Sequence, residues 1–274
     1  MAEKNLPLND SLKYPNSKLT FLGTGTSQGV PVIGCRCEVC QSSDERDKRL
    51  RTSAMIECDD MRIVIDAGPD FREQMLRTGV RTLDAILLTH EHKDHTGGLD
   101  DVRAFNFVDY PTIRPIDIYA THRTAEVVRK DFDYAFVSNK YIGVPEMRLH
   151  EFDPKKDFEV KGLSITPIRG HHSERFEVTG FRIDKMAYLT DFKQLMEGEI
   201  EKLRGVELLV VNALRFEPHY SHFCVEEALD LISKVKPRKA YLTHLSHTIG
   251  LHAQSENKLP EGVSLAYDRL SVEI

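Results

Sequence analysis

The sequence predicts a mixed α/β fold, because short segments typical of strands are interspersed with longer segments typical of helices. Its 274 residues are 41% apolar and 29% charged, which is enough apolar material to bury a sizeable core. Chains of this length and type often form a single domain. We therefore expect residues 1–274 to form one domain, and the sequence contains no internal repeat or low-complexity segment.

Strands and helices can be assigned in order along the first half of the chain. Apolar content or alternation predicts strands over residues 18–22, 54–58, 62–65 and 85–89. Asp59 and Asp60 predict a turn between the second and third strands. Helical patterns cover residues 70–78, ended by Gly79, and 121–132, begun by the N-cap candidate Thr121.

The second half continues with more strands and two further helices. Strands are expected over residues 163–168, 178–183, 186–189, 208–211 and 239–243. Helices are expected over residues 195–203 and 225–235, the second ended by Pro237. This order of elements gives the fold class α/β (α+β).

Charge and hydropathy limit the partners and the location of the chain. The formal net charge is -6 and the sequence pI is about 6.1, so the chain lacks the overall basic field that favours nucleic acid, although a local basic patch remains open. Residues 1–18 are polar and lack the apolar core of a signal peptide. No apolar run reaches the roughly 20 residues that a membrane helix needs. We expect a cytoplasmic protein without membrane partners.

A dense group of metal-binding residues follows the strand predicted over residues 85–89. His90, His92, Asp94 and His95 lie within six positions, and a turn at residues 96–98 follows them. Imidazole and carboxylate groups are ligands for zinc-like divalent ions. An extended backbone would point His90 and His92 the same way, leaving Asp94 and His95 for a second ion. The motif therefore predicts a site for two metal ions.

Further candidate ligands follow three later strands. His171 and His172 come after residues 165–168, Asp191 after residues 187–190, and His244 after residues 240–243. Strand ends from distant parts of a sequence can meet at one edge of a sheet. The repetition of this pattern predicts that these side chains join the metal motif, with either His171 or His172 as the histidine ligand.

Three of the five cysteines form the pattern Cys35-x-Cys37-x-x-Cys40. In a reducing compartment such a group is better explained by metal-binding thiolates than by disulfides. A tetrahedral zinc site needs a fourth ligand, which the spacing does not locate. Cys58 and Cys224 are interpreted as buried, inert thiols.

The metal motif, together with Asp66, Asp191 and His244, resembles the ligand series of the metallo-β-lactamase superfamily. The loop at residues 22–27 and the three cysteines are similar to those of the phosphoribosyl cyclic phosphate phosphodiesterases within that superfamily. The resemblance implies a four-layer αββα sandwich with two metal ions at one edge of its two sheets. It also implies a structural zinc on the three cysteines and on a histidine three residues after the last active-site ligand, which here is His247.

The resemblance assigns one ligand set to each active-site ion. It favours His172 over His171, because Gly180-Phe181 matches a Gly-aromatic pair that follows the ligand by about seven residues in similar sequences. The first ion is then held by His90, His92 and His172, the second by Asp94, His95 and His244, and Asp191 bridges the two. Three histidines with carboxylates accept zinc or manganese as well as iron, so the identity of the native metal stays open.

Two divalent ions would lower the pKa of a bridging water, and the resulting hydroxide would attack a phosphorus atom. We therefore expect an enzyme, a dinuclear metal-dependent phosphodiesterase acting on a small or cyclic phosphodiester. The resemblance assigns His222 to phosphate contact or to protonation of the leaving oxygen, and Asp94 is placed with it in the catalytic set. His219 is treated as accessory, and a homodimer is compatible with similar proteins.

Three other functions fit the sequence less well. A tRNA 3′-end processing endonuclease is disfavoured by the acidic net charge. A two-iron redox protein of this fold would replace the second histidine of the motif by glutamate, whereas His92 is intact. A non-catalytic, metal-stabilised binding protein is disfavoured by the complete ligand set, although fold and ligands alone do not establish activity.

Two weaker features need structural context. The Gly/Thr/Ser-rich loop at residues 22–29 could bring backbone amides near the site, but it lacks the lysine of a P-loop, so it is interpreted as architecture. Arg103 follows the metal motif and could contact a substrate phosphate or form an ion pair with Asp100 or Asp101.

Overall fold

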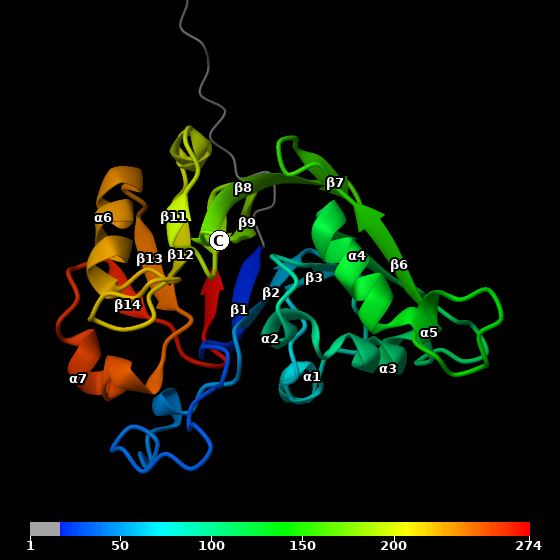
Figure 1. Ribbon diagram of the computed structural model, residues 1–274, viewed down its shortest axis with the longest axis horizontal. Helices are drawn as coiled ribbons and strands as arrows, with labels where there is room; N and C mark the ends of the chain where they lie inside the picture. The colour runs from blue at the N-terminus through cyan, green and yellow to red at the C-terminus, as the bar shows by residue number, and fades with distance from the viewer. Residues whose placement is uncertain (1–16) are drawn as a thin grey trace, which may run out of the picture.

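A computed structural model describes residues 17–274, in which two β-sheets are flanked by helices (Figure 1). The first sheet has the order β15 (Ser271–Glu273), β1 (Lys18–Gly23), β2 (Ser53–Cys58), β3 (Met61–Ile65), β4 (Ala85–Leu87), β5 (Ile116–Ala120) and β6 (Met147–Glu151). The second has the order β11 (Gln194–Leu195), β8 (Leu163–Ser173), β9 (Phe176–Ile183), β10 (Met186–Leu189), β12 (Leu208–Asn212), β13 (Lys239–Thr243) and β14 (Val263–Leu265), with β7 (Phe158–Val160) paired to β8.

Helices lie on the outer side of each sheet (Figure 1). The first sheet carries α1 (Phe71–Thr78), α2 (Lys93–Thr96), α3 (Arg103–Asn106), α4 (His122–Asp131) and α5 (Asp133–Phe136), and the second carries α6 (Val225–Val235) and α7 (His252–Glu256). Short 3-10 helices are η1 (Glu45–Asp47), η2 (Leu99–Val102), η3 (Glu199–Leu203) and η4 (His247–Ile249). None of the helices over residues 17–274 is long and apolar enough to span a bilayer.

Three groups of buried apolar side chains fill the spaces between these layers. Phe21, Phe181 and Tyr188 belong to the group that joins the two sheets. Phe71 packs in the group between the first sheet and its helices, and Leu231 of α6 packs in the group on the outer side of the second sheet. Because the central strands are covered on both faces, strands such as β4, β10 and β12 are almost wholly apolar, whereas the edge strand β6 is half polar. The predicted α/β fold with a four-layer αββα order is confirmed.

Local sequence signals account for most element boundaries. Gly79 ends α1 with φ 68°, and the Thr121 side chain accepts a hydrogen bond from the backbone N–H of Thr124 at the start of α4. Lys236 ends α6 in a left-handed conformation, one residue before Pro237. Asp59 has a positive φ in the predicted turn between β2 and β3.

Some predicted boundaries are wrong. Residues 195–203 do not form one helix, because Gly198 adopts φ 79° and separates the two-residue strand β11 from η3. The strand predicted over residues 163–168 runs on to Ser173, so His171 and His172 lie within β8 and not after it. The strands β5, β6, β7, β11, β14 and β15 were not predicted. The predictions for residues 1–16, including the missing signal-peptide core, lie outside the described residues.

Candidate metal centres

Three of the predicted site residues follow strand ends with the same unusual backbone conformation. Asp66 follows β3 with φ 63°, Asp191 lies after β10 with φ 64°, and His244 follows β13 with φ 58°. Non-glycine residues adopt this left-handed region uncommonly, and such strain is concentrated at functional sites. All three side chains are buried at the same edge of the two sheets. The turn out of each strand therefore aims one polar side chain at a shared point.

The metal motif reaches this point through a close backbone contact. Gly68 lies two residues after Asp66, and a Cβ atom at Gly68 would come within 1.9 Å of the Asp94 carbonyl oxygen. Any larger residue would push the motif away from the strand ends. His92 immediately precedes α2, whose first turn carries Asp94 and His95. The short helix thus turns Asp94 and His95 toward a different position from that of His90 and His92.

His90, His92 and His172 form the first donor group, with one ligand atom from each lying within 4.8 Å of the others. His90 Nε2 and His92 Nδ1 are 3.0 Å apart. The Nδ1 atom of His172 lies 2.8 Å from the Ser221 carbonyl oxygen, which can only accept, so this nitrogen carries the proton. That tautomer leaves the His172 Nε2 lone pair for a cation. His171 is not in the group; it pairs with Glu177 and Gln194 in the sheet.

Asp94, His95, Asp191 and His244 form the second donor group. Asp191 faces both histidines, with Oδ2 at 3.3 Å from His95 Nε2 and Oδ1 at 3.0 Å from His244 Nε2. Asp94 Oδ2 lies 3.2 Å from the same His95 nitrogen. The Asp191 carboxylate also lies within 4.8 Å of a ring nitrogen of His172, so it is close to both donor groups. This is the position that a bridging ligand requires.

The hydrogen bonds around the second group fit a divalent cation. His95 Nδ1 donates to Asp66 Oδ2 at 2.7 Å, which orients the imidazole and leaves Nε2 with its lone pair. The Nε2 atoms of His95 and His244 are buried and have no hydrogen-bond partner among the described residues. Buried polar atoms are rarely left unpaired in folded proteins. Two unpaired imidazole nitrogens beside carboxylates are explained by a metal ion between them.

The electrostatics of the second donor group also favour a divalent cation. Burial alone would raise the pKa of Asp191, but His244 and His95 hold this pKa well below its ordinary value. Burial alone would lower the pKa of His95, but Asp191, Asp66 and Asp94 hold it well above its ordinary value. The carboxylates therefore demand positive charge at this point. A metal ion supplies that charge without a proton on His95.

A cavity of about 500 Å³ opens onto both donor groups. His222 lines it, with its ring stacked on His244 at 4.6 Å and its Nδ1 atom 3.7 Å from Asp191 Oδ1. Burial, helped by His244, lowers the pKa of His222 to about 2, so its imidazole is neutral at pH 7. His219 lines the cavity beside it, and its Nδ1 atom accepts a hydrogen bond from the Ser221 backbone N–H at 3.3 Å.

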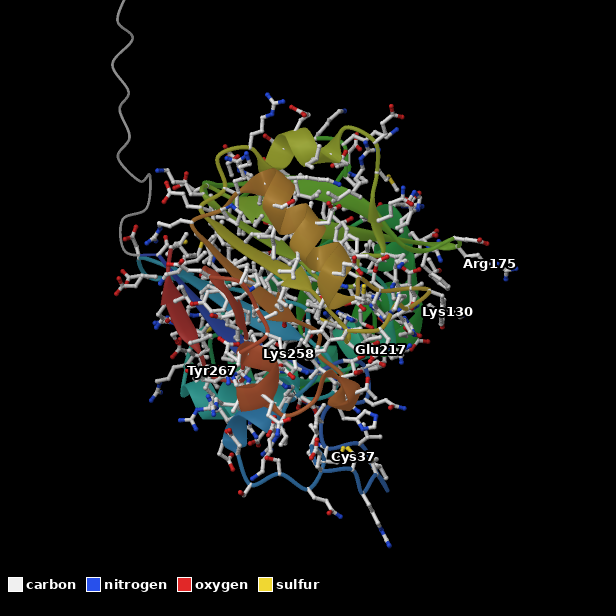
Figure 2. All side chains as sticks on the ribbon, turned by 90° about the vertical axis from the view of Figure 1, so that its left-hand side faces the viewer. Cys37, Lys130, Arg175, Glu217, Lys258 and Tyr267 are labelled. Atoms are coloured by element: carbon white, nitrogen blue, oxygen red, sulfur yellow. The ribbon has the colours of Figure 1, made fainter. Side chains whose placement is uncertain are left out.

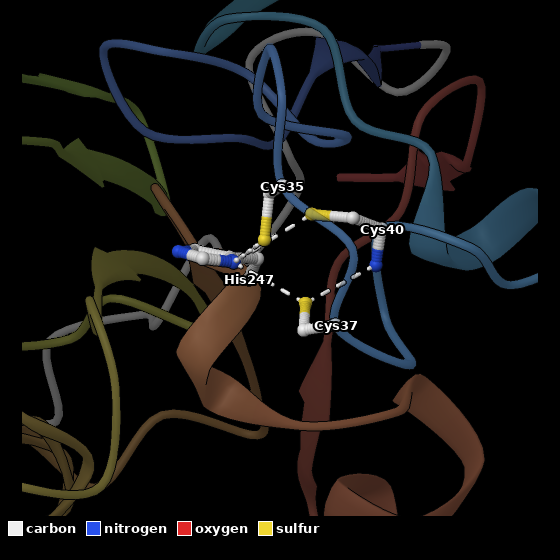
Figure 3. A group of neighbouring side chains, drawn as sticks. All are labelled: Cys35, Cys37, Cys40 and His247. Atoms are coloured by element: carbon white, nitrogen blue, oxygen red, sulfur yellow. Dashed lines mark hydrogen bonds between the residues drawn. The ribbon is translucent and has the colours of Figure 1, made fainter.

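The three clustered cysteines meet His247 from η4 at a separate point (Figure 3). The Nδ1 atom of His247 is 3.4 Å from the Sγ atoms of Cys35 and Cys37 and 3.6 Å from that of Cys40. The Cys40 backbone N–H and His247 lower the pKa of Cys37 to about 6, whereas burial raises the pKa of Cys40 to about 11. Three thiolates could not coexist here without a cation. Three sulfurs and one nitrogen are the donor set of a closed tetrahedral zinc site.

The structure shows which of the weaker candidates from the sequence lie at the active-site cavity. Arg103 donates to Asp100 at 3.0 Å and does not line the active-site cavity, so its ion-pair interpretation holds. The loop at residues 22–29 was interpreted as architecture, but Thr26, Ser27 and Gln28 form one wall of the cavity. Cys58 and Cys224 are both buried, as predicted.

Arg215 lines the cavity and was missed by the sequence analysis. Its guanidinium contacts only the backbone carbonyl oxygens of Glu217 at 3.4 Å and Pro218 at 3.2 Å, and no carboxylate of residues 17–274 lies within ion-pair distance. An arginine two residues before the segment that carries His219 and His222 was the available signal. An arginine without a carboxylate partner at the rim of a metal site is suited to an anionic group.

Known proteins resemble this chain in sequence and in structure. A family described as "Beta-lactamase superfamily domain" matches residues 61–245. The crystal structure titled "a New Diphosphatase from the PhnP Family" is 39% identical with a TM-score of 0.87, and the match covers 94% of this chain and 97% of that one. The zinc-bound PqqB of Methylobacterium extorquens is 18% identical, with a TM-score of 0.75 and coverage of 94% and 100%; this shows the fold alone.

A curated relative from Porphyromonas gingivalis, named Octanoyltransferase, is 42% identical over 256 residues. The match covers 93% of this chain but only 51% of that protein, so the chain spans about half of its length. The family match, the PhnP-family neighbour and the two donor groups support a metal-dependent hydrolase. Because the family match spans more than half of the sequence, the chain belongs to the beta-lactamase superfamily.

Proposed function

We propose that this protein is a dinuclear metal-dependent phosphodiesterase that hydrolyses a small or cyclic phosphodiester. The observation that carries the proposal is the position of Asp191, whose carboxylate faces His95 and His244 and lies within reach of His172. Two zinc or manganese ions would be held by His90, His92 and His172 and by Asp94, His95 and His244, with Asp191 between them. When bound, they would lower the pKa of a water molecule and neutralise phosphoryl oxygens.

The chain's own residues would bind and orient the phosphodiester. Thr26, Ser27 and Gln28 offer hydroxyl and amide groups to the cavity, which His219 and His222 also line. Because the Nδ1 atom of His219 accepts a hydrogen bond, its Nε2 atom carries the proton and can donate to a phosphate oxygen. A cavity of about 500 Å³ suits a small substrate.

His222 would act as a hydrogen-bond donor to the phosphoryl group. Its lowered pKa leaves a neutral imidazole at pH 7, and the positive charge of nearby ions would lower that pKa further. A neutral ring can donate one hydrogen bond, whereas protonation of the leaving oxygen needs a group that arrives with an extra proton. Of the two roles that the resemblance leaves open for His222, the neutral imidazole favours phosphate contact.

His222→Ala is expected to retain the active-site metals and to lower turnover by about 100-fold, the effect typical of losing one preorganised hydrogen-bond donor at the reacting centre. His222→Gln keeps an N–H donor, so it should recover part of that loss. The measurements are kcat and metal content of both variants. An equal loss of turnover in both variants would favour proton transfer over hydrogen bonding. Loss of active-site metal would instead make His222 a metal ligand, because its ligand atom lies near those of His172 and Asp191.

The experiment that tests the proposed function is a turnover screen of the metal-loaded protein. Its substrates are cyclic and linear phosphodiesters, a diphosphate diester, a phosphomonoester, a β-lactam and a thioester. Preferred turnover of a phosphodiester supports the proposal. Activity confined to the thioester or the β-lactam would contradict it, and no turnover of any substrate would favour a non-catalytic binding protein. Preferred cleavage of a precursor tRNA would favour the endonuclease alternative.

A second candidate, hydrolysis of a diphosphate diester, is favoured by Arg215. The guanidinium lines the cavity without a carboxylate partner among the described residues and could hold the phosphate that is not attacked. The PhnP-family neighbour with 39% identity carries the word diphosphatase in its title. The single charge of a simple cyclic diester would not need this side chain in addition to the two ions.

Arg215→Gln should therefore raise KM for a diphosphate diester by about tenfold and leave KM for a small cyclic diester nearly unchanged, since a charge-assisted contact contributes about 1.5–3 kcal/mol. Arg103→Gln is the matched control, because Arg103 pairs with Asp100 away from the cavity. Steady-state kinetics on both substrates decide the result. An equal effect on both substrates would remove the argument for a diphosphate.

The cytoplasmic location and the homodimer expected from the sequence stay predictions.

A further inference from the structure

A second cleft, of about 640 Å³, lies between the segment before β2, the end of α1 and the loop between β14 and β15. Five of its lining side chains are cations: Arg46, Lys48, Arg49, Arg77 and Arg269. Two carboxylates, Glu45 and Asp268, also line it. It shares no lining residue with the active-site cavity. In a chain with a net charge of -6, this local excess of positive charge stands out. We refer to it as the basic cleft.

Two of the five cations have no carboxylate within ion-pair distance among residues 17–274. Arg49 is only 3% exposed, and its guanidinium donates to three neutral partners: Thr24 Oγ1 at 2.9 Å, the Ala266 carbonyl oxygen at 2.6 Å and His252 Nδ1 at 3.0 Å. A buried guanidinium is normally paired with an anion. Its charge is therefore held at the base of the cleft without a direct counter-ion.

Arg269 is the second such cation, and it is exposed at the rim. Its backbone has φ 73°, a conformation that favours glycine or asparagine over arginine, and its N–H donates to the Phe21 carbonyl oxygen at 2.7 Å. The fold thus holds an arginine side chain where the backbone does not favour one. The other three cations have acidic partners: Arg46 pairs with Asp44, Lys48 with Glu45, and Arg77 with Glu73 and Asp268. Of these partners, Asp44 and Glu73 lie outside the cleft lining.

The two carboxylates offset only part of the positive charge of the cleft. The Asp268 side chain is buried and lies 3.6 Å from the Arg77 guanidinium, and its oxygens also accept from the backbone N–H groups of Thr24 and Leu50 and from the Thr24 hydroxyl. Its charge therefore serves Arg77 and these neighbouring N–H and O–H groups, and it forms no ion pair with Arg49 or Arg269. Glu45 is 83% exposed and pairs with Lys48. Tyr267 adds an aromatic wall beside the cations.

We propose that the basic cleft is a binding site for a small phosphorylated metabolite, separate from the metal centres. Phosphate oxygens would supply the counter-ion that Arg49 and Arg269 lack, and guanidinium groups match phosphate geometry. The size of the cleft fits a sugar or nucleoside phosphate. The acidic net charge of the chain argues against RNA, whose longer backbone needs an extended basic surface. Figure 2 shows Tyr267 on one side of the molecule, away from the exposed cations Lys130 and Arg175.

The test is calorimetric titration of the full-length, metal-loaded protein with fructose 1,6-bisphosphate, with fructose as the uncharged comparison. The same titration in Asp191→Asn separates the cleft from the metal centres, because that variant lacks the central active-site ligand. Arg269→Asn keeps the backbone conformation and should weaken bisphosphate binding by about tenfold in both backgrounds. Lys130→Gln is the control and should bind like the wild type.

Retained binding in Asp191→Asn that is weakened by Arg269→Asn supports the site. Three outcomes would overturn it: binding that disappears with Asp191→Asn, binding that is unaffected by Arg269→Asn, or equal heats with fructose. A short single-stranded RNA that binds more tightly than the bisphosphate, in a manner dependent on Arg269, would assign the cleft to nucleic acid instead.

Discussion

Asp191→Asn is expected to lower hydrolysis to below about 1% of the wild-type rate and to remove active-site metal. Its carboxylate is the only group that faces both His95 and His244 while lying within reach of His172, in the part of the chain that the structure describes. Loss of a group that merely orients a metal ligand already costs about 10- to 100-fold in affinity or activity, so loss of the central ligand should cost more. Asparagine keeps the volume and removes the charge.

The backbone makes asparagine a sharper choice than alanine at this position. Asp191 has φ 64°, and asparagine tolerates the left-handed region, whereas alanine would add strain unrelated to metal binding. Asp184→Asn is the matched control, because Asp184 has φ 50° in the turn between β9 and β10, outside the metal groups. Metal analysis, turnover and circular dichroism should show a folded, metal-depleted Asp191 variant and a normal control. Two equivalents of retained metal with near-native turnover would mean that the ligand assignment is wrong.

The sequence predicted which residue types could bind metal better than it predicted how their side chains are arranged in space. Metal-binding residues are few in kind, so the positions of His90, His92, Asp94 and His95 carried the signal without any structure. The same holds for Asp191 and His244, which follow recognisable apolar strands. The choice between His171 and His172 was different, because a side chain's direction in a strand depends on register. In the structure His172 joins His90 and His92, and a register shift near the end of β8 accompanies it.

Other features depend on contacts between distant segments and could not be seen in one sequence. His247 lies more than two hundred residues from the cysteines, and only the resemblance to a known family located it. Arg215 gives no motif by itself; its importance lies in having no carboxylate partner among the described residues. The strands β14 and β15 were missed because each has three residues, too few for a periodic pattern, and neither contains an unbroken apolar run like that of residues 85–88 at β4.

Cys37→Ser is expected to remove about one equivalent of zinc and to lower the melting temperature by about 10 °C. When free zinc is present at 1,000 times the Kd of the site, its binding adds about 4 kcal/mol to the free energy of unfolding. Each kcal/mol shifts the melting temperature of a domain of this size class by about 2–4 °C. Serine is a poor zinc ligand, and Cys37 Sγ is one of the two sulfurs nearest to His247 Nδ1. The site joins the loop after β1 to η4, three residues beyond His244, so activity should fall through loosening of one wall of the cavity.

The measured zinc content distinguishes the loss of a zinc ligand from the loss of an ordinary buried thiol. Cys58→Ala removes a buried cysteine in β2 that lies outside the cysteine group, so it should lower stability modestly and leave zinc content unchanged. Chelator treatment should bring the wild type and Cys37→Ser to about the same melting temperature, because it removes the active-site ions from both proteins and the structural zinc that only the wild type holds. If the native wild-type protein instead titrates three free thiols without chelator, these thiols bind no metal. The stability of the loop would then depend on the Cys40 N–H to Cys37 contact and its neighbours alone.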